Sequence, residues 1–295
     1  MLDDALLFAL ALRRLPGVGR VTAGRLLARF PTLGALRATP REQVLVRLKG
    51  TAGASALVTT LADDAVMAPA LDTARAEAAA LDARRVRVHA PNLPGWPARL
   101  DALDRGDRPA LLFTYGDAAV LDRPSAAFFG APGLDVPAFE HAQNLLRAIA
   151  ARGVVPVAGL STGFDVVVHK VAAGLPCPSI AVAACGLGRI SPPMRPGATA
   201  TVRAGGLLVS PFEMEHGPFP HDDGERARTM VALAAVSLFF DPAPGSAEAR
   251  ALLSALALGR PTFGMGPRLP DSTPRLTGDP NADADAVAAA AGALR

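Results

Sequence analysis

An apolar run leads directly into a glycine-rich segment at Val154-Val155-Pro156-Val157-Ala158-Gly159-Leu160-Ser161-Thr162-Gly163-Phe164-Asp165. The first five residues form a short apolar run that favours a strand, and the glycines after it permit a tight turn before a helix. Backbone N–H groups at the start of a helix can receive a phosphate. The stretch therefore predicts a strand–turn–helix unit of an α/β sheet, with a ligand site at the turn.

The same alternation of apolar runs and amphipathic helical stretches continues through most of the chain. Strands are expected at residues 110–115, 126–130, 154–158, 179–184, 207–210, 236–240 and 261–265, and helices near residues 137–152, 163–173, 224–235, 246–259 and 283–294. Short apolar strands separated by helices are typical of a parallel sheet covered on both faces. We therefore expect an α/β fold with a Rossmann-like, doubly wound, mostly parallel sheet, whose ligands bind beyond the carboxyl ends of the strands.

The N-terminal part has a different pattern. Helical stretches are expected at residues 2–14, 20–30, 33–48 and 71–85, and no strand pattern appears before Val86-Arg87-Val88-His89. Residues 91–97 hold three prolines and a glycine, which is typical of a linker. We therefore expect a small all-helical module over residues 1–90, followed by the α/β domain over residues 91–295.

The turn Leu15-Pro16-Gly17-Val18-Gly19-Arg20 has the apolar-Gly-apolar-Gly pattern of a helix-hairpin-helix. Its two glycines allow backbone N–H groups to approach a phosphate closely, which positions a strand without recognising its sequence. Gly17, Val18, Gly19 and Arg20 are therefore candidate DNA contacts, and Arg25 adds a cation on the next helix. A plain tight turn between two packed helices would need the same glycines, so both interpretations stay open.

Charge is distributed unevenly along the chain. Residues 1–90 carry 13 basic and 8 acidic side chains, whereas residues 91–295 carry 17 and 19. A phosphate-bearing partner would therefore be attracted mainly to the N-terminal part. Asp3 and Asp4 stand where a signal peptide would be basic, and no apolar run is long enough to span a membrane. We expect a cytoplasmic protein with no membrane partner.

Several segments resemble the DNA-processing protein A (DprA/Smf) family. Gly159-Leu160-Ser161-Thr162-Gly163-Phe164-Asp165 with His169 is similar to its pattern Gly-Leu-Ala-x-Gly-Ile-Asp-x-x-Ala-His. Other similar segments are Trp96-Pro97 through Leu111-Leu112-Phe113 with Gly116-Asp117, Gly206-Leu207-Leu208-Val209-Ser210 with Phe219-Pro220, and Gly259-Arg260-Pro261-Thr262-Phe263. The resemblance extends over nearly the whole chain, and it depends on the order and spacing of these segments together.

This resemblance implies a Rossmann-like domain that binds single-stranded DNA, forms a homodimer and helps to load a RecA-type recombinase during natural transformation. It implies no enzymatic activity, and we expect no cofactor and no metal. On the residues that match the family, the candidate DNA contacts are Gly130, Ser161, Thr162, Gly163, Lys170, Arg226 and Arg228.

The chain departs from the family pattern at several points. The Val-Gly-Ser/Thr-Arg turn reads Phe129-Gly130-Ala131-Pro132, and proline offers neither a charge nor an N–H donor to a phosphate. The Arg-Asn-Arg signature is best matched by Arg226-Ala227-Arg228, after Asp222, Asp223 and Glu225, which would repel a phosphate that they faced. We expect no winged-helix domain after the last helix, and the chain is identified as a divergent member of the family.

Individual residues keep alternative interpretations. The N–H groups at Gly163 could receive a phosphate or serve only helix–strand packing. Asp165 could bond the turn or orient His169 one helical turn later, and we expect the two residues to structure the loop. Arg226 and Arg228 point about 200° apart around their helix, so at most one of them should face the ligand site, and a solvated surface arginine is the alternative for each.

His216, His221, Asp222 and Asp223 carry metal-binding groups, but their spacing predicts no metal site.

Two other functions remain as alternatives. The first is a nucleotide-binding or nucleoside-monophosphate-cleaving enzyme of the related lysine-decarboxylase-like fold, whose Pro-Gly-Gly-x-Gly-Thr-x-x-Glu loop is represented by Pro244-Gly245-Ser246-Ala247-Glu248. The second is a degenerate relative that keeps the fold and the dimer surface but acts only as an interaction protein.

Overall fold

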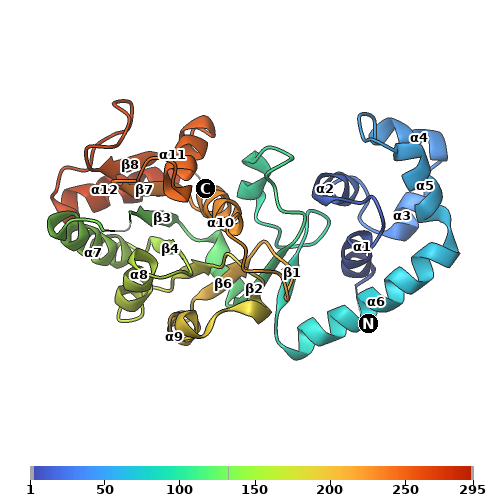
Figure 1. Cartoon of the computed structure of the whole chain (residues 1–295), viewed down its shortest axis with the longest axis horizontal. Helices are drawn as coiled ribbons and strands as arrows, with labels where there is room; N and C mark the ends of the chain where they lie inside the picture. The colour runs from blue at the N-terminus through green and yellow to red at the C-terminus, as the bar shows by residue number, and fades with distance from the viewer. Residues whose placement is uncertain (1–2, 132, 294–295) are drawn as a thin grey trace. The chain divides into compact units, whose positions relative to one another are not determined.

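The strands of the computed structural model, which describes residues 3–131 and 133–293, form a sheet in the order β1-β2-β6-β5-β4-β3-β7-β8 (Figure 1). Their bounds are β1 (Arg87–His89), β2 (Leu112–Gly116), β3 (Ser125–Gly130), β4 (Val155–Gly159), β5 (Ile180–Val182), β6 (Leu207–Ser210), β7 (Val236–Phe240) and β8 (Thr262–Met265). Within the order β6-β5-β4-β3-β7-β8, every pair of neighbouring strands is parallel. The expected mostly parallel, doubly wound α/β sheet is confirmed.

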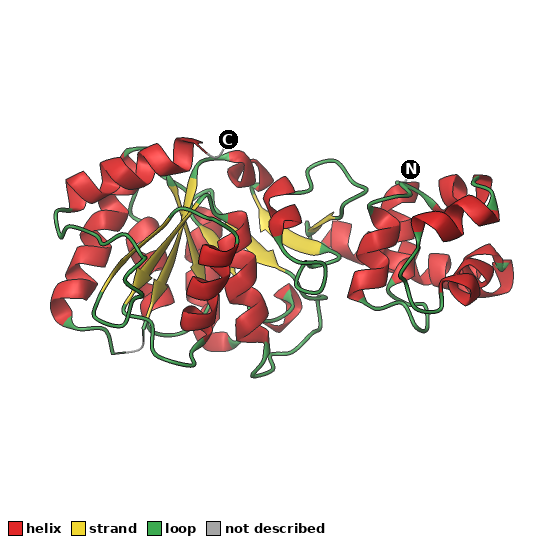
Figure 2. Cartoon of the chain, turned by 90° about the horizontal axis from the view of Figure 1, so that it is seen from above, coloured by secondary structure: helices red, strands yellow, loops and turns green. Residues whose placement is uncertain are grey.

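The strand order reverses direction at β3, because β4, β5 and β6 follow it on one side and β7 and β8 on the other. In a sheet of this kind, ligands bind beyond the carboxyl ends of the strands near such a reversal. Strands β4, β6 and β7 are buried along their whole length, which explains why they are mainly apolar. Figure 2 shows helices on both sides of these strands.

The helices of the α/β part are α7 (Val136–Ala151), α8 (Phe164–Ala172), α9 (Arg195–Arg203), α10 (Asp222–Leu233), α11 (Ala247–Ala257) and α12 (Pro280–Ala293). Helix α9 is missing from the sequence-based expectation. Its first turn contains Pro196 and Gly197, and only Ala198 and Thr201 along it are buried, so it shows no apolar stripe. The expected helix at residues 283–294 is α12, except that residue 294 lies outside the described residues.

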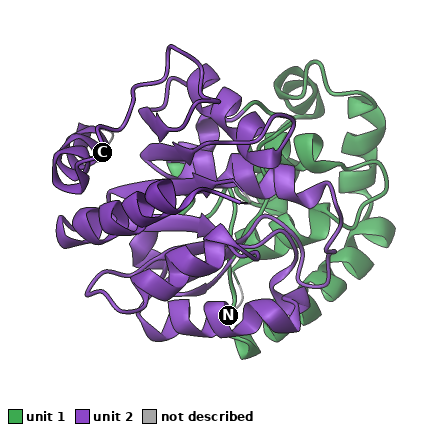
Figure 3. Ribbon diagram, turned by 60° about the vertical axis from the view of Figure 1, so that its left-hand side comes forward, with its two compact units in different colours: residues 1–98, 104–113 green, residues 99–103, 114–295 purple. Residues whose placement is uncertain are grey.

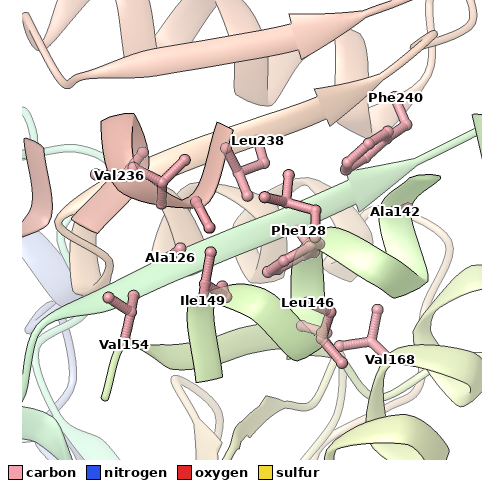
Figure 4. Packing of buried hydrophobic residues seen from close by; sticks show 14 of the residues in the cluster. Ala126, Phe128, Ala142, Leu146, Ile149, Val154, Val168, Val236, Leu238 and Phe240 are labelled. Carbon is pink, nitrogen blue, oxygen red and sulfur yellow. The ribbon is translucent and has the colours of Figure 1, made fainter. Parts of the chain in front are cut away.

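Helices α7 and α12 cover β3 and β7 on one face of the sheet. Leu146 and Ile149 from α7 meet Phe128 of β3 and Phe240 of β7 in an apolar core (Figure 4). The rings of Phe128 and Phe240 lie nearly parallel, with their centroids 6.2 Å apart. This core holds in place the carboxyl ends of β3 and β7, the two neighbouring strands at which the strand order changes direction.

The N-terminal part is all-helical up to β1. Its helices are α1 (Asp4–Leu12), α2 (Arg20–Leu27), α3 (Leu33–Ala38), α4 (Arg41–Arg47), α5 (Ala54–Ala62) and α6 (Asp64–Ala83). The expected stretch at residues 33–48 is two helices, because Thr39 and Pro40 separate α3 from α4. Helix α5 was not expected, and α6 begins well before residue 71. Residue 2 of the first expected helix lies outside the described residues.

Short 3-10 helices occur at Ala98–Ala102, Ala118–Asp122, Leu187–Arg189 and Pro192–Met194.

The chain forms two compact units (Figure 3): residues 1–98 and 104–113 in unit 1, and residues 99–103 and 114–295 in unit 2. Hydrogen bonds tie residues beyond 90 into unit 1. Asn92 donates to the carbonyls of Ala5 at 3.0 Å and Pro31 at 2.8 Å, and Arg20 donates to that of Gly106 at 2.7 Å. The division into domains after residue 90 stays a prediction.

Among the described helices, none is by itself long and apolar enough to cross a membrane; α5 and α6 together pass by length and composition, with a 75° bend between them.

Candidate nucleic-acid interface

The loop between β4 and α8 presents polar groups at the carboxyl edge of the sheet. Gly159 ends β4, and Gly163, with a φ of 77°, precedes the first turn of α8 without any side chain capping that turn. Thr162 is exposed and Ser161 is half-buried beside it. Uncapped N–H groups and hydroxyls that face solvent here can donate to an anion.

Arg226 on α10 bonds to Asp165, the second residue of α8, and so fixes this loop. Its Nη1 donates to Oδ2 of Asp165 at 2.8 Å, and Ser161 Oγ donates to the same oxygen at 2.6 Å. Arg226 Nη2 lies 3.4 Å from Oδ1 of Asp223 and 3.9 Å from Oε1 of Glu248. Only 6% of Arg226 is exposed, so the solvated-arginine alternative is wrong for it. Its guanidinium is engaged by carboxylates and positions the loop, and its contact with DNA stays a prediction.

Gly159 is required by this pair. A β-carbon at position 159 would overlap the guanidinium of Arg226 and the carboxylate of Asp165. The same logic applies to Gly130 at the end of β3, because the ring of Phe164 occupies the place of a side chain there. Gly130 thus packs against α8. Pro132, which the family comparison singles out, lies outside the described residues.

The imidazole of His169 contacts the backbone of the loop. Its Nε2 lies 2.8 Å from the carbonyl oxygen of Gly159, and its Nδ1 lies 3.4 Å from Oγ1 of Thr201 on α9. Burial lowers the pKa of His169 and outweighs the Gly159 hydrogen bond and the nearby Asp165 charge, which raise it. Asp165 and His169 therefore take different partners, Arg226 and Gly159, instead of the direct i, i+4 pair considered from the sequence.

A pocket of about 240 Å³ opens next to this loop, where β4 and β5 end. Its lining mixes hydroxyls, one cation, one carboxylate and apolar groups: Leu160, Ser161, Thr162, Ala184, Cys185, Arg189, Ile190, Ser191, Met194, Pro218 and Asp223. Arg189 is exposed and lies in the short helix after β5. It was not among the candidates from the sequence, because it is far along the chain from the family motifs.

An aromatic ladder, made of Phe212, His216, Phe219 and His221, continues from the pocket lining at Pro218. The rings of Phe212 and His216 stack at 4.5 Å, and those of Phe219 and His221 stack at 5.7 Å with 2° between their planes. His216 meets Phe219 edge-on at 5.2 Å. Phe219 is 51% exposed, so one side of the ladder is open to solvent.

Asp222 is buried and bonds to two residues of the ladder. It is 1% exposed, and it accepts the backbone N–H of Phe219 at 2.8 Å and lies 3.0 Å from Nε2 of His216. Asp222 therefore faces the loop interior, and Asp223 lies against Arg226, so neither carboxylate is left without a partner. Among the described residues, no group of three or more His, Cys, Asp and Glu is placed to hold a metal ion.

The candidate turn of unit 1 has the geometry expected of a hairpin. Gly17 adopts a φ of 77°, and Gly19 precedes α2 without a capping side chain. Both glycines are exposed, and Val18 lies between them. Arg20 begins α2, whereas Arg25 lies about 7.5 Å further along it and donates from Nη1 to Oγ1 of Thr51 at 2.8 Å.

Two of the candidate cations lie away from the loop at Ser161. Lys170 is exposed near the end of α8, about 10 Å along the helix from Gly163. Arg228 is half-buried on α10, two residues beyond Arg226 and thus about 200° around the helix. Their contact with DNA stays a prediction.

Comparisons with known proteins agree with this architecture. Protein Smf of Escherichia coli (strain K12) is 30% identical over 160 residues, 54% of this chain and 43% of that protein, so the match spans less than half of that relative. The X-ray structure of DNA processing protein A (DprA) from Streptococcus pneumoniae has a similar fold, with a TM-score of 0.68, 16% identity, and coverage of 97% of this chain and 98% of that one.

A structure of DNA processing protein A from Helicobacter pylori, described as giving insight into its unique single-stranded DNA binding mode, is also similar. Its TM-score is 0.54 at 25% identity, covering 64% of this chain and 84% of that one. The family model described as DNA recombination-mediator protein A matches residues 87–275, which is more than half of the chain. The chain therefore belongs to the DNA recombination-mediator protein A family.

Proposed function

We propose that this protein binds single-stranded DNA and passes it to a RecA-type recombinase during DNA uptake and recombination. The family description and the DNA-binding relative from Helicobacter pylori support this proposal. The protein acts by binding rather than by catalysis, works as a homodimer and resides in the cytoplasm.

The observation that carries the proposal is the exposed Phe219–His221 stack next to the pocket at Ser161. Single-stranded nucleic acids bind where aromatic rings receive bases and where cations and N–H groups receive the backbone. Phe219 offers the ring, Arg189 offers the cation, and the uncapped start of α8 offers N–H donors. Because every base has a π-face, such a site accepts a strand whatever its sequence.

The pocket is small enough to limit what enters it. Pockets for drug-sized ligands measure roughly 300–1,000 Å³, and about 240 Å³ is below that range. We infer that the pocket receives one nucleotide of the strand while neighbouring bases lie along the ladder. The hairpin turn at Gly17 and Gly19 holds a further stretch of backbone through α2 and Arg20.

The decisive experiment compares the binding of a fluorescent single-stranded oligonucleotide by the wild-type protein, Phe219→Ala and Val136→Ala. Loss of one base–aromatic stack costs about 1–3 kcal/mol, or roughly 5- to 150-fold in affinity. Val136→Ala is the matched control, because Val136 is an exposed apolar residue (68%) on α7. Equal affinities for all three proteins would remove the ladder from the site, and no binding by the wild type would leave the interaction-protein alternative.

One observation keeps the enzyme alternative open to test. Glu248, the carboxylate expected for nucleoside-monophosphate cleavage, lies 3.9 Å from Nη2 of Arg226, and its side chain is 20% exposed. On our proposal, the wild-type protein releases no ribose phosphate from nucleoside monophosphates. Release that Glu248→Gln abolishes would establish the enzyme instead.

A further inference from the structure

Unit 1 contains a second turn that matches the hairpin turn in its leucine, its glycine and its backbone hydrogen bond. Residues 15–18 read Leu-Pro-Gly-Val and residues 48–51 read Leu-Lys-Gly-Thr. In both, the leucine is buried and its carbonyl accepts the N–H of the fourth residue, at 3.2 Å in the first turn and 2.9 Å in the second. Gly17 and Gly50 adopt φ values of 77° and 79°. The helix pairs α1–α2 and α4–α5 are thus joined by the same kind of turn.

A basic patch, made of Arg25, Arg29, Arg47 and Lys49, surrounds the second turn. Arg25 donates to Thr51 Oγ1 at 2.8 Å, and Arg29 donates to the carbonyl of Arg25 at 3.3 Å. The guanidinium of Arg47 lies over the ring of Phe30, 5.3 Å from its centroid. Arg29, Arg47 and Lys49 are exposed.

None of the four cations of the patch has a carboxylate partner within the described part of the chain. Residues 1–62 as a whole carry 9 basic and only 3 acidic side chains. Arg25 and Arg29 are joined by a hydrogen bond, and Arg47 and Lys49 flank the turn that Arg25 reaches, so their like charges repel one another. The patch is therefore built for a polyanion, and planar guanidinium groups beside a hydroxyl suit phosphate oxygens.

We propose that the second turn and the basic patch bind the second strand of duplex DNA while the hairpin turn holds the first. This inference rests on the proposed function, in which the turn at Gly17 contacts a DNA backbone. Arg25 lies about 7.5 Å along α2 from Arg20, and its guanidinium reaches the second turn at 2.8 Å. Two such turns, joined by the hydrogen bond from Arg25 to Thr51, can each meet one of the two backbones that face one another across a groove of B-DNA. On a duplex, unit 1 thus contacts both backbones, whereas on a single strand it contacts one backbone through the hairpin turn.

The test uses the full chain with a blunt duplex and with one of its strands, each at roughly 50 and 200 mM salt. Lys49→Glu and Arg29→Glu reverse exposed charges of the patch. Arg75→Glu makes the same charge change on α6, where Arg75 pairs with Asp72. We expect the patch variants to weaken duplex binding at least tenfold and each to lower the salt slope by about one. Arg75→Glu should leave duplex binding nearly unchanged, and no variant should alter single-strand binding comparably.

Several results would overturn the inference. It fails if the wild type binds the single strand but not the duplex, a result that leaves the proposed function standing. It also fails if the patch variants bind the duplex as the wild type does, if Arg75→Glu weakens binding equally, or if a polyglutamate peptide binds more tightly than the duplex. Lys49→Gln, which removes the charge without reversing it, should give a smaller loss in the same direction if Lys49→Glu does not fold. Duplex binding without single-strand binding would support the patch and overturn the proposed function.

Discussion

Arg226→Met should destabilise unit 2 strongly. In the wild type, the guanidinium is 2.8 Å from Asp165, and the two side chains are only 7% and 12% exposed. Removing one partner of a buried ion pair strands the other charge, which costs about 3–5 kcal/mol. The pair with Asp223 adds little, because that carboxylate is half-exposed. Methionine keeps the apolar stem in place, so the loss reflects the stranded carboxylate of Asp165.

This loss can be measured by urea unfolding followed by circular dichroism and by scanning calorimetry. For a unit of 150–250 residues, about 3–5 kcal/mol corresponds to a fall in Tm of roughly 6–20 °C. Arg203→Met is the matched control, because Arg203 is an exposed arginine on α9, and it should shift the free energy of unfolding by less than about 0.5 kcal/mol. A change below about 1 kcal/mol for Arg226→Met would show that the buried pair does not hold the loop.

Three further predictions concern the loops that carry the proposed contacts. Gly159→Ala should cost about 1–3 kcal/mol of unfolding free energy, because its β-carbon overlaps buried groups, whereas Gly174→Ala, with its nearest neighbour at 3.6 Å, should be nearly neutral. The pKa of His169 is lowered in the folded state, so below about pH 6.5 the unfolded state binds more protons and the free energy of unfolding falls as the pH drops. His169→Gln should reduce this dependence by up to about 1.4 kcal/mol per pH unit. An unchanged dependence of stability on pH would contradict a buried neutral imidazole. Gly17→Glu should weaken single-strand binding, measured by anisotropy, more than Lys170→Glu does; the reverse order would move the backbone contact from the hairpin turn to the end of α8.

The sheet was predictable because its strands are apolar on both faces. Strands β6 and β7 fall at the residues expected, and the others differ only at their ends. Helix α9 escaped prediction because Pro196 and Gly197 break its start and its contacts lie along one narrow edge. Local pattern is a good guide where burial is continuous, and a poor one where a helix packs by a few small residues.

The interior of the candidate site could not be predicted from local sequence. Arg226 and Asp165 are 61 residues apart, so nothing near either residue indicates that they pair. The ladder was hidden for a similar reason. His216 and His221 suggested metal-binding groups by type, and only the fold shows that their rings stack with Phe212 and Phe219. The glycine turn at Gly163, by contrast, was visible because a helix start after a strand has a local signature.

The most direct test of the account is a salt titration of the affinity of the wild-type protein for a single-stranded oligonucleotide. On the proposed function, Arg20 and Arg189 meet phosphates of the single strand, and about two such contacts give a slope of log K against log salt concentration of about −1.4. The account predicts measurable binding at low salt with that shallow slope. No binding in dilute buffer, or binding indifferent to salt, would contradict it.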